Sequence, residues 1–438
     1  MTHKLIGARS GAGPSRRQLL AGAGGLALTL GARGALAAGA ENVLKIGFIS
    51  PRTGALAGFG ETDGYVLELA RKALANGLTV GGKTYEVQIL DRDTQSDPSR
   101  ASQLAKTLIN SDQVDLMLPV STPETINPVA DACEAAGVPC LSTVMPWEAW
   151  YFGRGGKPGQ PSPFKWTYHF GFGGGEFFKT YVSLWNSLET NKKVGVLYPN
   201  DADGNAIREN LAPGLAKAGF TIIDPGPYED GTTDYSAQIA LFKKEKCEIF
   251  NTFPIPPDFA AFWRQAAQQG YTKMVKIGQI AKTGLFPSQV DSLGDLGFNL
   301  SSAAYWHKAF PYKSSLAGVS GEEIADGYEK STGKQWTQQL GASMALFDAG
   351  VATLKASADP KNKAEVVKAL STLNTVTMAG KVDFTSGPFP NISPGPIIGA
   401  QWVKAKPGSK FKLDFVVTEH VTDPNVPIGA KLIAYNSK

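Results

Sequence analysis

Residues 114–143 read VDLMLPVSTPETINPVADACEAAGVPCLST and contain one complete strand–helix–strand unit. VDLMLPV (114–120) and VPCLST (138–143) are short apolar runs, the pattern expected of strands that are buried on both faces. Between them, ETINPVADACEAAG (124–137) predicts a helix that stops at Gly137, because glycine readily adopts the left-handed conformation that ends helices. Two strands joined through a helix are predicted to pair in parallel.

The same alternation continues on the N-terminal side of this unit. Short apolar runs predict strands over residues 43–50 and 85–91, and apolar residues at helical spacing predict helices over residues 62–74 and 98–109. This alternation is typical of a parallel sheet whose two faces are covered by helices.

A second unit of the same design follows the first. Helices and strands are predicted in alternation, beginning with a helix, over residues 176–188, 192–199, 205–220, 220–224, 234–246, 247–253, 257–270 and 274–280. A chain of 438 residues is long enough for two compact units. The expected fold class is therefore α/β, with two doubly wound parallel-sheet lobes.

The segment between the two units, residues 147–172, is unusually aromatic. It reads WEAWYFGRGGKPGQPSPFKWTYHFGF, and nine of its 26 residues are Trp, Tyr or Phe, against 10% of the whole chain. Five glycines and three prolines exclude a single regular element. The aromatic side chains either form a wall of a binding site or pack an enlarged loop onto the first unit.

The first 37 residues resemble an export signal. They carry five basic residues and no acidic one, then a weakly apolar stretch and a small-residue site at Ala35-Leu36-Ala37, so cleavage is expected near Ala37. The run Ser15-Arg16-Arg17 is similar to a twin-arginine signal. Without these residues, the chain contains 38 basic and 39 acidic residues, which gives a net charge of about −1. A nearly neutral chain has no electrostatic footprint for nucleic acid or for an anionic membrane.

No sequence pattern predicts a catalytic centre, a cofactor or a metal site, so the chain is not expected to be an enzyme. There is no GxSxG or HExxH motif. FGFGGGE (170–176) lacks the spacing of a dinucleotide loop, and NDADGN (200–205) lacks the distant Glu of a calcium loop. The four histidines are isolated: His3, His169, His307 and His420.

The sequence contains three cysteines: Cys133, Cys140 and Cys247. An odd number cannot pair completely within one chain, and their spacing fits no zinc site. All three are predicted to be buried structural thiols.

Four stretches of the sequence resemble one family, the extracytoplasmic solute-binding proteins of ABC importers in the branched-chain amino-acid and amide class. These stretches are residues 46–69, 121–143, 194–220 and 234–271. The resemblance implies two α/β lobes joined by three crossovers, with the ligand held between the lobes. The first lobe is then expected over residues 42–168 and 298–375, and the second over residues 169–297 and 376–438, after the signal at 1–37.

The resemblance also implies a function. Members capture a small organic solute by hinge closure and deliver it to a membrane permease. The expected location is the periplasm, the expected state a monomer, and the expected ligand an amino acid, an amide, or an aromatic or aliphatic carboxylate. Two alternatives remain: a sensory binding protein that docks on a receptor, and an exported enzyme.

Ligands of open α/β sheets lie beyond the carboxyl ends of the strands, and several polar residues are predicted there. In the resembled family, two loops at such ends bind a ligand carboxylate through hydroxyl and backbone N–H groups. Ser121, Thr122 and Thr143 match these loops here, and the helix that begins near Pro123 adds a favourable dipole. The alternative is that these side chains only cap a helix or shape a turn.

The sequence departs from the amino-acid binders of this family at two places. Pro146 stands where a threonine hydroxyl is expected, and Ile280 stands where an acidic residue would meet the ligand's ammonium group. Nearby, Gln279 and Lys282 offer an amide and a cation. A buried ammonium without a carboxylate partner costs several kcal/mol, so an α-amino acid is disfavoured unless Asp203 supplies the charge.

Aromatic residues are the last group of candidate ligand contacts. Trp147, with Trp150 as a possible neighbour, and Met145 belong to a loop that follows a predicted strand, and Phe59 and Phe253 lie on other loops of this kind. Stacking on such side chains suits a flat ligand, and Lys282 would then pair with its carboxylate.

Overall fold

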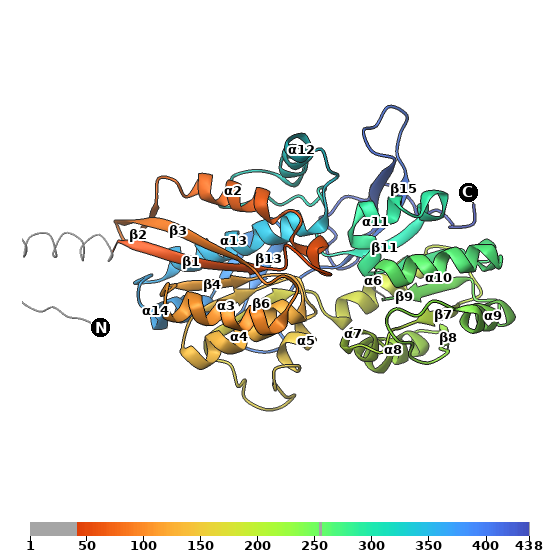
Figure 1. Ribbon diagram of the computed structural model, residues 1–438, viewed down its shortest axis with the longest axis horizontal. Coiled ribbons are helices and arrows are strands. Elements are labelled where there is room, and N and C mark those ends of the chain that lie inside the picture. The colour runs from red at the N-terminus through yellow and green to blue at the C-terminus, as the bar shows by residue number, and fades with distance from the viewer. Residues whose placement is uncertain (1–41, 254–255, 438) are drawn as a thin grey trace, which may run out of the picture. The chain divides into compact units, whose positions relative to one another are not determined.

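The structure is a computed structural model that describes residues 42–253 and 256–437, without the side chains of residues 202, 203 and 256 (Figure 1). The predicted export signal lies outside the described residues. Leu44–Lys438 forms one compact unit that contains two large sheets.

The first sheet has seven strands in the order β14-β6-β5-β4-β1-β3-β2. Its core is parallel, and β2 and β3 form an antiparallel hairpin at one edge. The strands are β1 (Val43–Ser50), β2 (Leu78–Val80), β3 (Lys83–Asp93), β4 (Leu116–Pro119), β5 (Cys140–Ser142), β6 (Thr167–Gly171) and β14 (Ile392–Pro394).

The helices that accompany this sheet come from two separate parts of the chain. They are η1 (Ala57–Gly60), α2 (Asp63–Ala73), α3 (Pro98–Asn110), α4 (Pro123–Ala136), α5 (Trp147–Tyr151), α12 (Gly321–Thr332), α13 (Gln338–Ala356) and α14 (Lys363–Ser371), with the small hairpin β12 (Asn374–Thr377) and β13 (Gly380–Asp383). As predicted, α4 ends at Gly137, whose φ is +68°.

The second sheet also has seven strands, in the order β16-β15-β11-β10-β9-β7-β8. Its strands are β7 (Lys193–Leu197), β8 (Thr221–Ile223), β9 (Ile249–Thr252), β10 (Ile277–Ile280), β11 (Leu300–Ala304), β15 (Ile398–Lys404) and β16 (Leu413–Glu419). Strands β7 to β11 pair in parallel, and β15 and β16 extend the sheet in antiparallel fashion.

The second sheet is accompanied by helices that lie mostly between its strands in sequence. They are α6 (Gly174–Asn186), α7 (Ala202–Ala206), η2 (Ile207–Leu211), α8 (Ala212–Lys217), α9 (Ser236–Lys244), α10 (Pro256–Gln268), η3 (Tyr271–Lys273), η4 (Lys282–Leu285), α11 (Pro287–Asp291) and η5 (Gly294–Gly297). The single helix predicted over residues 205–220 is interrupted by a π-helical turn at η2, next to Pro213, which lacks the amide hydrogen that a regular helix needs.

The chain passes between the sheets three times, after β6, after β11 and after β14. Two of these positions differ from the expected boundaries. Strand β11 pairs with β10 and β15, so the second sheet extends past residue 298. Strand β14 pairs with β6 through Ile392 and His169, so the first sheet gains residues well beyond 375. The segment of β14 was not predicted as a strand, because its pairing with β6 alone defines it.

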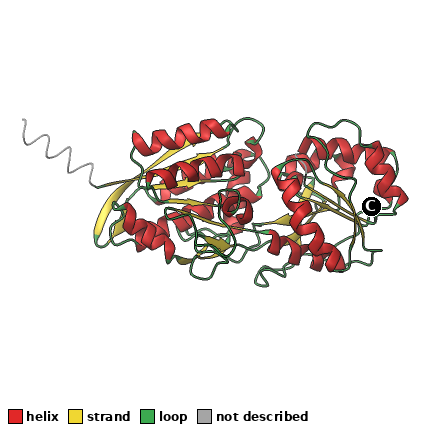
Figure 2. Cartoon of the chain, turned by 90° about the horizontal axis from the view of Figure 1, so that it is seen from below, coloured by secondary structure: helices red, strands yellow, loops and turns green. Residues whose placement is uncertain are grey.

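Helices cover both faces of the sheets (Figure 2). Every residue of β4, β5, β6, β9 and β10 is buried, as expected of parallel strands between helices. Helix α13 lies against the first sheet, where a Cβ atom on Gly350 would stand 3.1 Å from the Leu118 side chain. The three cysteines are buried and form no disulfide, as predicted. Among the described residues, no helix combines the length and the apolar character needed to cross a bilayer.

Candidate functional site

Ser121, Thr122 and Thr143 lie together at the carboxyl ends of β4 and β5. All three are buried, Val120 forms a parallel bridge with Thr143, and the Ser121 N–H donates to the Thr143 carbonyl at 3.4 Å. Ser121 has a φ of +108°, a conformation that costs free energy in any residue except glycine. Its Oγ is buried and has no hydrogen-bond partner among the described residues. A strained residue with an unsatisfied hydroxyl is a candidate ligand contact.

Thr122 occupies the N-cap position of α4 without acting as a side-chain cap. Its backbone is extended, its hydroxyl makes no capping bond, and its Oγ1 lies 3.5 Å from Thr125 Oγ1. Because capping does not occupy this side chain, the N-terminus of a 14-residue helix remains available to an anion.

In the second lobe, Lys282 lies among carboxylates that come from other loops. Its Nζ is 3.5 Å from Asp201 Oδ2. Burial and the nearby Asp201 and Asp258 raise the pKa of Asp230 above its ordinary value, and Lys282 opposes this shift. Asp201 lies 81 positions before Lys282 in the sequence, so no local pattern predicted this pair. The side chain of Asp203 lies outside the described residues, but Asp201, two positions earlier, contacts Lys282.

Gln279 and Ile280 belong to β10 itself rather than to a loop. Both are fully buried, and Gln279 pairs in register with Asn251 on β9 and Ser301 on β11. Neither polar atom of the Gln279 side chain has a hydrogen-bond partner within the described residues. The Asn251 side chain bonds to the Tyr198 hydroxyl at 2.8 Å. This row of polar side chains lies inside the second lobe.

Part of the aromatic segment packs in a small core that it shares with Ile126 of α4 and Ile392 of β14. Met145 and Trp150 are buried in one cluster with Tyr151 and Phe164. The guanidinium group of Arg154 lies 4.4 Å from the Trp150 ring centre and 4.3 Å from that of Phe164. For Met145 and Trp150 the structure therefore favours the loop-packing alternative over a ligand contact.

Trp147 is half-buried and lies against the first crossover. Its ring contacts Phe152 and Phe389 at 5.8 and 5.7 Å between centres, and its backbone N–H donates to the Phe172 carbonyl at 2.9 Å. A Cβ atom on Gly173 would stand 2.0 Å from Trp147 Nε1, so this close approach requires glycine.

Glu148, next along α5, binds the start of α6 and was not identified from the sequence. The Gly174 N–H donates to its Oε1 at 2.8 Å, and its Oε2 is buried without a hydrogen-bond partner in the part of the chain that the structure describes. Burial raises the pKa of Glu148 from 4.5 to about 7, and Glu176 adds to this effect. A titratable group thus connects the aromatic segment to the first crossover.

Asp63 is a second buried carboxylate that the sequence did not single out. The Ser343 hydroxyl on α13 donates to its Oδ1 at 2.8 Å, and its Oδ2 has no such partner among the described residues. Complete burial raises the pKa of Asp63 to about 6.

The two remaining aromatic candidates have different surroundings. Phe59 makes an edge-to-face contact with Phe286 of the second lobe at 5.1 Å. Phe253 is buried against Phe177, Tyr181 and Tyr198. Phe59 therefore touches the other lobe, whereas Phe253 belongs to the interior of its own.

Thr143 also borders a small pocket beside the three crossovers. The lining residues are Thr143, Val144, Phe170, Gly171, Phe172, Tyr305, Ala342, Thr377, Ala379, Lys381, Val382, Gly395 and Pro396. Phe172 and Tyr305 stack in its wall at 5.3 Å. The pocket joins Thr143 to the crossovers and does not include Lys282 or Phe253.

Among the described residues, the histidines offer no exposed acid–base pair. His169 Nδ1 lies 2.9 Å from Ser142 Oγ, but both residues are fully buried, and burial lowers the pKa of His169 to about 3. Burial likewise lowers the pKa of His307 to about 4. Within the described residues, no group of three or more His, Cys, Asp or Glu side chains is placed to hold a metal ion.

The chain passes three times between two sheets that are covered by helices, and polar groups lie at the carboxyl ends of the strands. This arrangement is typical of a two-lobed ligand-binding protein. The chain belongs to the periplasmic binding protein family, whose sequence model matches residues 43–396. This confirms the family expected from the sequence. Membership indicates an extracytoplasmic location.

Solved structures with the same fold include proteins with different bound ligands. One is a solute binding protein of an ABC transporter from Rhodopseudomonas palustris BisB5 in complex with 3,4-dihydroxybenzoic acid, at 18% identity, with a TM-score of 0.68 and coverage of 88% of this chain and 99% of that one. Another is a leucine binding protein from Thermotoga maritima, at 18% identity, a TM-score of 0.67, and 87% and 99% coverage. A branched-chain amino acid binding protein from Streptococcus pneumoniae in complex with isoleucine has 18% identity, a TM-score of 0.62, and 86% and 99% coverage. At this identity the likeness shows the fold alone.

Among curated proteins, an uncharacterized protein of Methanocaldococcus jannaschii is 24% identical over 204 residues. The match covers 45% of this chain and 46% of that protein.

Proposed function

We propose that this chain is the solute-binding component of an ABC importer, that it captures a small carboxylate in the periplasm, and that it delivers this solute to a membrane permease. The observation that carries the proposal is Ser121: a buried, unsatisfied hydroxyl held in a strained conformation beside the free N-terminus of α4. Hydroxyl and N–H donors at a helix N-terminus suit a carboxylate, which accepts hydrogen bonds and carries negative charge.

The far end of the ligand is proposed to meet Lys282 and Asp201. This pair offers both a cation and a carboxylate, so it accepts either an ammonium group or a phenolic hydroxyl. The structural neighbours with bound isoleucine and bound 3,4-dihydroxybenzoic acid represent these two ligand classes. Amino acids and aromatic acids are therefore the two candidates, and Asp201 is the proposed carboxylate partner for the ammonium group of an amino acid.

A thermal-shift screen of the chain from Ala38 onward tests the function. The panel contains leucine, isoleucine, 4-hydroxybenzoate, 3,4-dihydroxybenzoate and short amides. A ligand at 100 times its dissociation constant stabilises the folded chain by about 2.7 kcal/mol, which is readily measured. Recovery of the ligand unchanged after incubation separates binding from the enzyme alternative. If no carboxylate on the panel shifts the melting temperature, the proposal fails for these classes.

Replacing Ser121 with alanine is expected to weaken binding of the carboxylate found by the screen by about 10- to 150-fold. The variant loses one hydrogen bond to a charged group, worth about 1.5–3 kcal/mol, and isothermal titration measures the change. Ser99→Ala, on the exposed surface of α3, is the matched control and should leave affinity unchanged. Equal affinity of Ser121→Ala and the original chain would exclude this hydroxyl from the site.

A further inference from the structure

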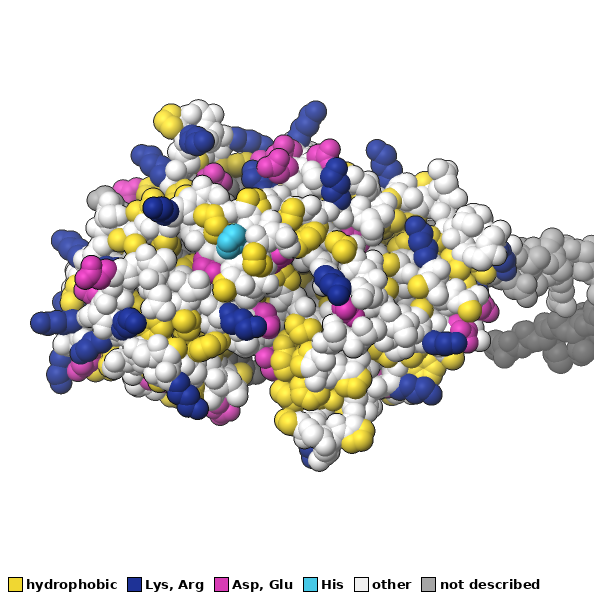
Figure 3. Space-filling model, turned by 180° about the vertical axis from the view of Figure 1, so that it is seen from behind, with side chains coloured by type: hydrophobic (Ala, Val, Ile, Leu, Met, Phe, Trp, Pro, Cys, Tyr) yellow, Lys and Arg dark blue, Asp and Glu magenta, His cyan; other side chains and the backbone are white. Residues whose placement is uncertain are grey.

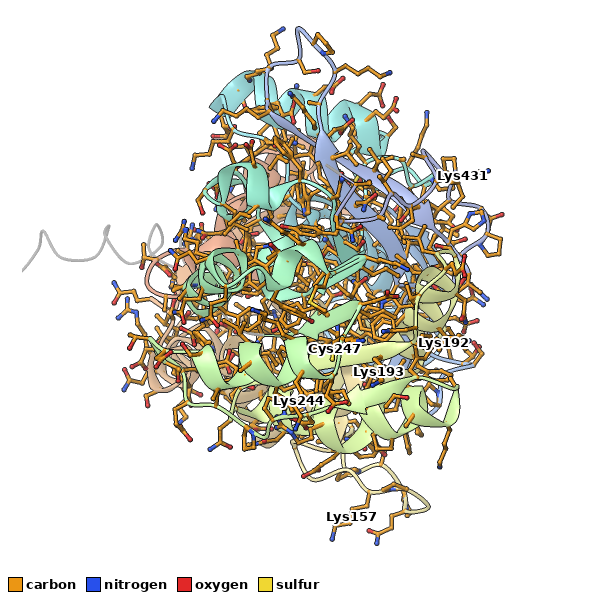
Figure 4. All side chains as sticks on the ribbon, turned by 90° about the vertical axis from the view of Figure 1, so that its right-hand side faces the viewer. Lys157, Lys192, Lys193, Lys244, Cys247 and Lys431 are labelled. Carbon is orange, nitrogen blue, oxygen red and sulfur yellow. The ribbon has the colours of Figure 1, made fainter. Side chains whose placement is uncertain are left out.

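Exposed lysines gather at the amino ends of the strands of the second sheet. Because β7, β9 and β10 are parallel, their amino ends share one edge, opposite to the edge that carries Asp201 and Lys282. Figure 4 looks onto this end of the chain and labels Lys192, Lys244 and Lys431. We call the following exposed residues the lysine face: Lys192, Lys243, Lys244, Lys246, Lys273 and Lys431.

The C-terminal tail, which carries Lys431, reaches this edge through Tyr435 and Asn436. The Tyr435 N–H donates to the Lys276 carbonyl at 2.7 Å, and the Asn436 side chain donates to the Lys273 carbonyl at 3.2 Å. Residues far apart in the sequence thereby contribute to one surface. The same end lies at the left of Figure 3, where dark-blue side chains gather.

Few carboxylates offset this charge. Residues 189–193, 243–248 and 271–276 contain three acidic side chains. Glu245 pairs with Lys193 at 3.3 Å, and Glu248 pairs with Lys276 at 3.1 Å, so both are occupied by lysines outside the face. Glu189 is the third, and it leaves the six lysines with an excess of about five positive charges.

Two of these lysines occupy backbone positions that favour glycine. Lys192 has a φ of +59° and Lys246 a φ of +58°. Lys246 follows the C-cap of α9, where glycine avoids the steric cost of the left-handed conformation. The chain therefore carries two charged side chains where glycine would fit with less strain.

We propose that the lysine face binds the anionic phospholipid surface of the membrane that carries the permease. Lysines are flexible point charges, and a dispersed set of them suits a fluid layer of headgroups better than one shaped partner. Each lysine near an anionic bilayer strengthens binding by about fivefold, and salt screens this attraction. The total charge of the chain is near neutral because carboxylates elsewhere balance the lysine face. The total charge alone therefore does not indicate this local positive cluster.

Binding through this face leaves the candidate ligand site accessible. Lys282 and Asp201 follow the carboxyl ends of β10 and β7, whereas the lysine face surrounds the amino ends of the same strands. Membrane contact would retain the chain near its permease without blocking solute entry. The inference goes beyond the proposed transport role and requires no knowledge of the ligand.

Co-sedimentation with lipid vesicles tests the proposal. The chain from Ala38 onward is mixed with vesicles of equal parts phosphatidylglycerol and phosphatidylcholine, and with vesicles of phosphatidylcholine alone. Binding is expected only to the anionic vesicles, and it should disappear near 1 M salt, where the screening length falls to about 3 Å. The triple variant Lys192→Glu, Lys244→Glu and Lys273→Glu should lower the partition constant at least tenfold.

A matched triple variant keeps the net charge equal while changing another surface. Lys106→Glu, Lys157→Glu and Lys330→Glu alter exposed lysines of α3, the aromatic segment and α12. This control should retain most of the vesicle binding, and circular dichroism should show both variants folded. Equal losses in the two variants, or no binding of the original chain to anionic vesicles, would overturn the proposal. Either result leaves the ligand screen, and hence the transport role, unaffected.

Discussion

Replacing Trp150 with alanine is expected to lower the free energy of unfolding by about 3–5 kcal/mol, the range for large aromatic residues in a core. Trp150 is fully buried and stacks on His169 with 5.7 Å between ring centres. It also covers the guanidinium group of Arg154, whose side chain is only 1% exposed and pairs with Asp131 at 2.7 Å. Its removal leaves a cavity beside a buried cation, and both effects favour unfolding.

Chemical denaturation of the two forms measures this loss. Phe152→Ala is the matched control, because Phe152 belongs to the same segment but is 37% exposed. It should cost about 1 kcal/mol or less, as surface substitutions usually do. If Trp150→Ala were as mild as the control, Trp150 would not be a central part of the small core described above.

Replacing Glu148 with glutamine is expected to alter the pH dependence of stability. The pKa of Glu148 is raised from 4.5 to about 7 on folding, so the folded chain holds this proton more tightly. The resulting stabilisation is complete below about pH 4.5 and is lost as the pH rises through 7. A shift of this size corresponds to about 3 kcal/mol. Glutamine keeps an acceptor for the Gly174 N–H but cannot ionise, so the variant lacks this loss.

Urea denaturation at pH 5 and pH 8 measures the effect. Between pH 5 and pH 8, the free energy of unfolding of the Glu148→Gln variant should rise by about 3 kcal/mol relative to that of the original chain. Glu176→Gln is the control on the adjoining helix, and it should show a smaller change because Glu176 only adds to the shift of Glu148. Parallel profiles for Glu148→Gln and the original chain would show that Glu148 ionises with an ordinary pKa.

Local signals explain why much of the fold was predictable. The helix predicted over residues 124–137 is α4, since a proline near its start and a glycine after its end define its limits within the sequence itself. The parallel pairing of the strands on either side follows from the same unit. The crossover positions were not predictable to the same degree, because β14 is a strand only by virtue of its pairing with β6.

The candidate site was predictable where it depends on strand ends. Ser121, Thr122 and Thr143 meet as expected because the carboxyl ends of adjacent parallel strands share an edge. The partnership of Lys282 with Asp201 spans 81 positions, and the bond from Gly174 to Glu148 spans 26, so neither had a local signal. Aromatic composition alone also did not reveal that the Arg154 guanidinium group packs against Trp150 and Phe164.

The interleaving of the two sheets has a consequence for the synthesis of the chain. The first sheet is completed by β14 and packs against α13, so a ribosome must translate past residue 394 before that sheet has all its strands. The second sheet is complete only after β16, which ends at Glu419, has been translated. Neither half can therefore mature as an independent domain behind the other, and we expect the nascent polypeptide to acquire its stable core only when translation is almost finished.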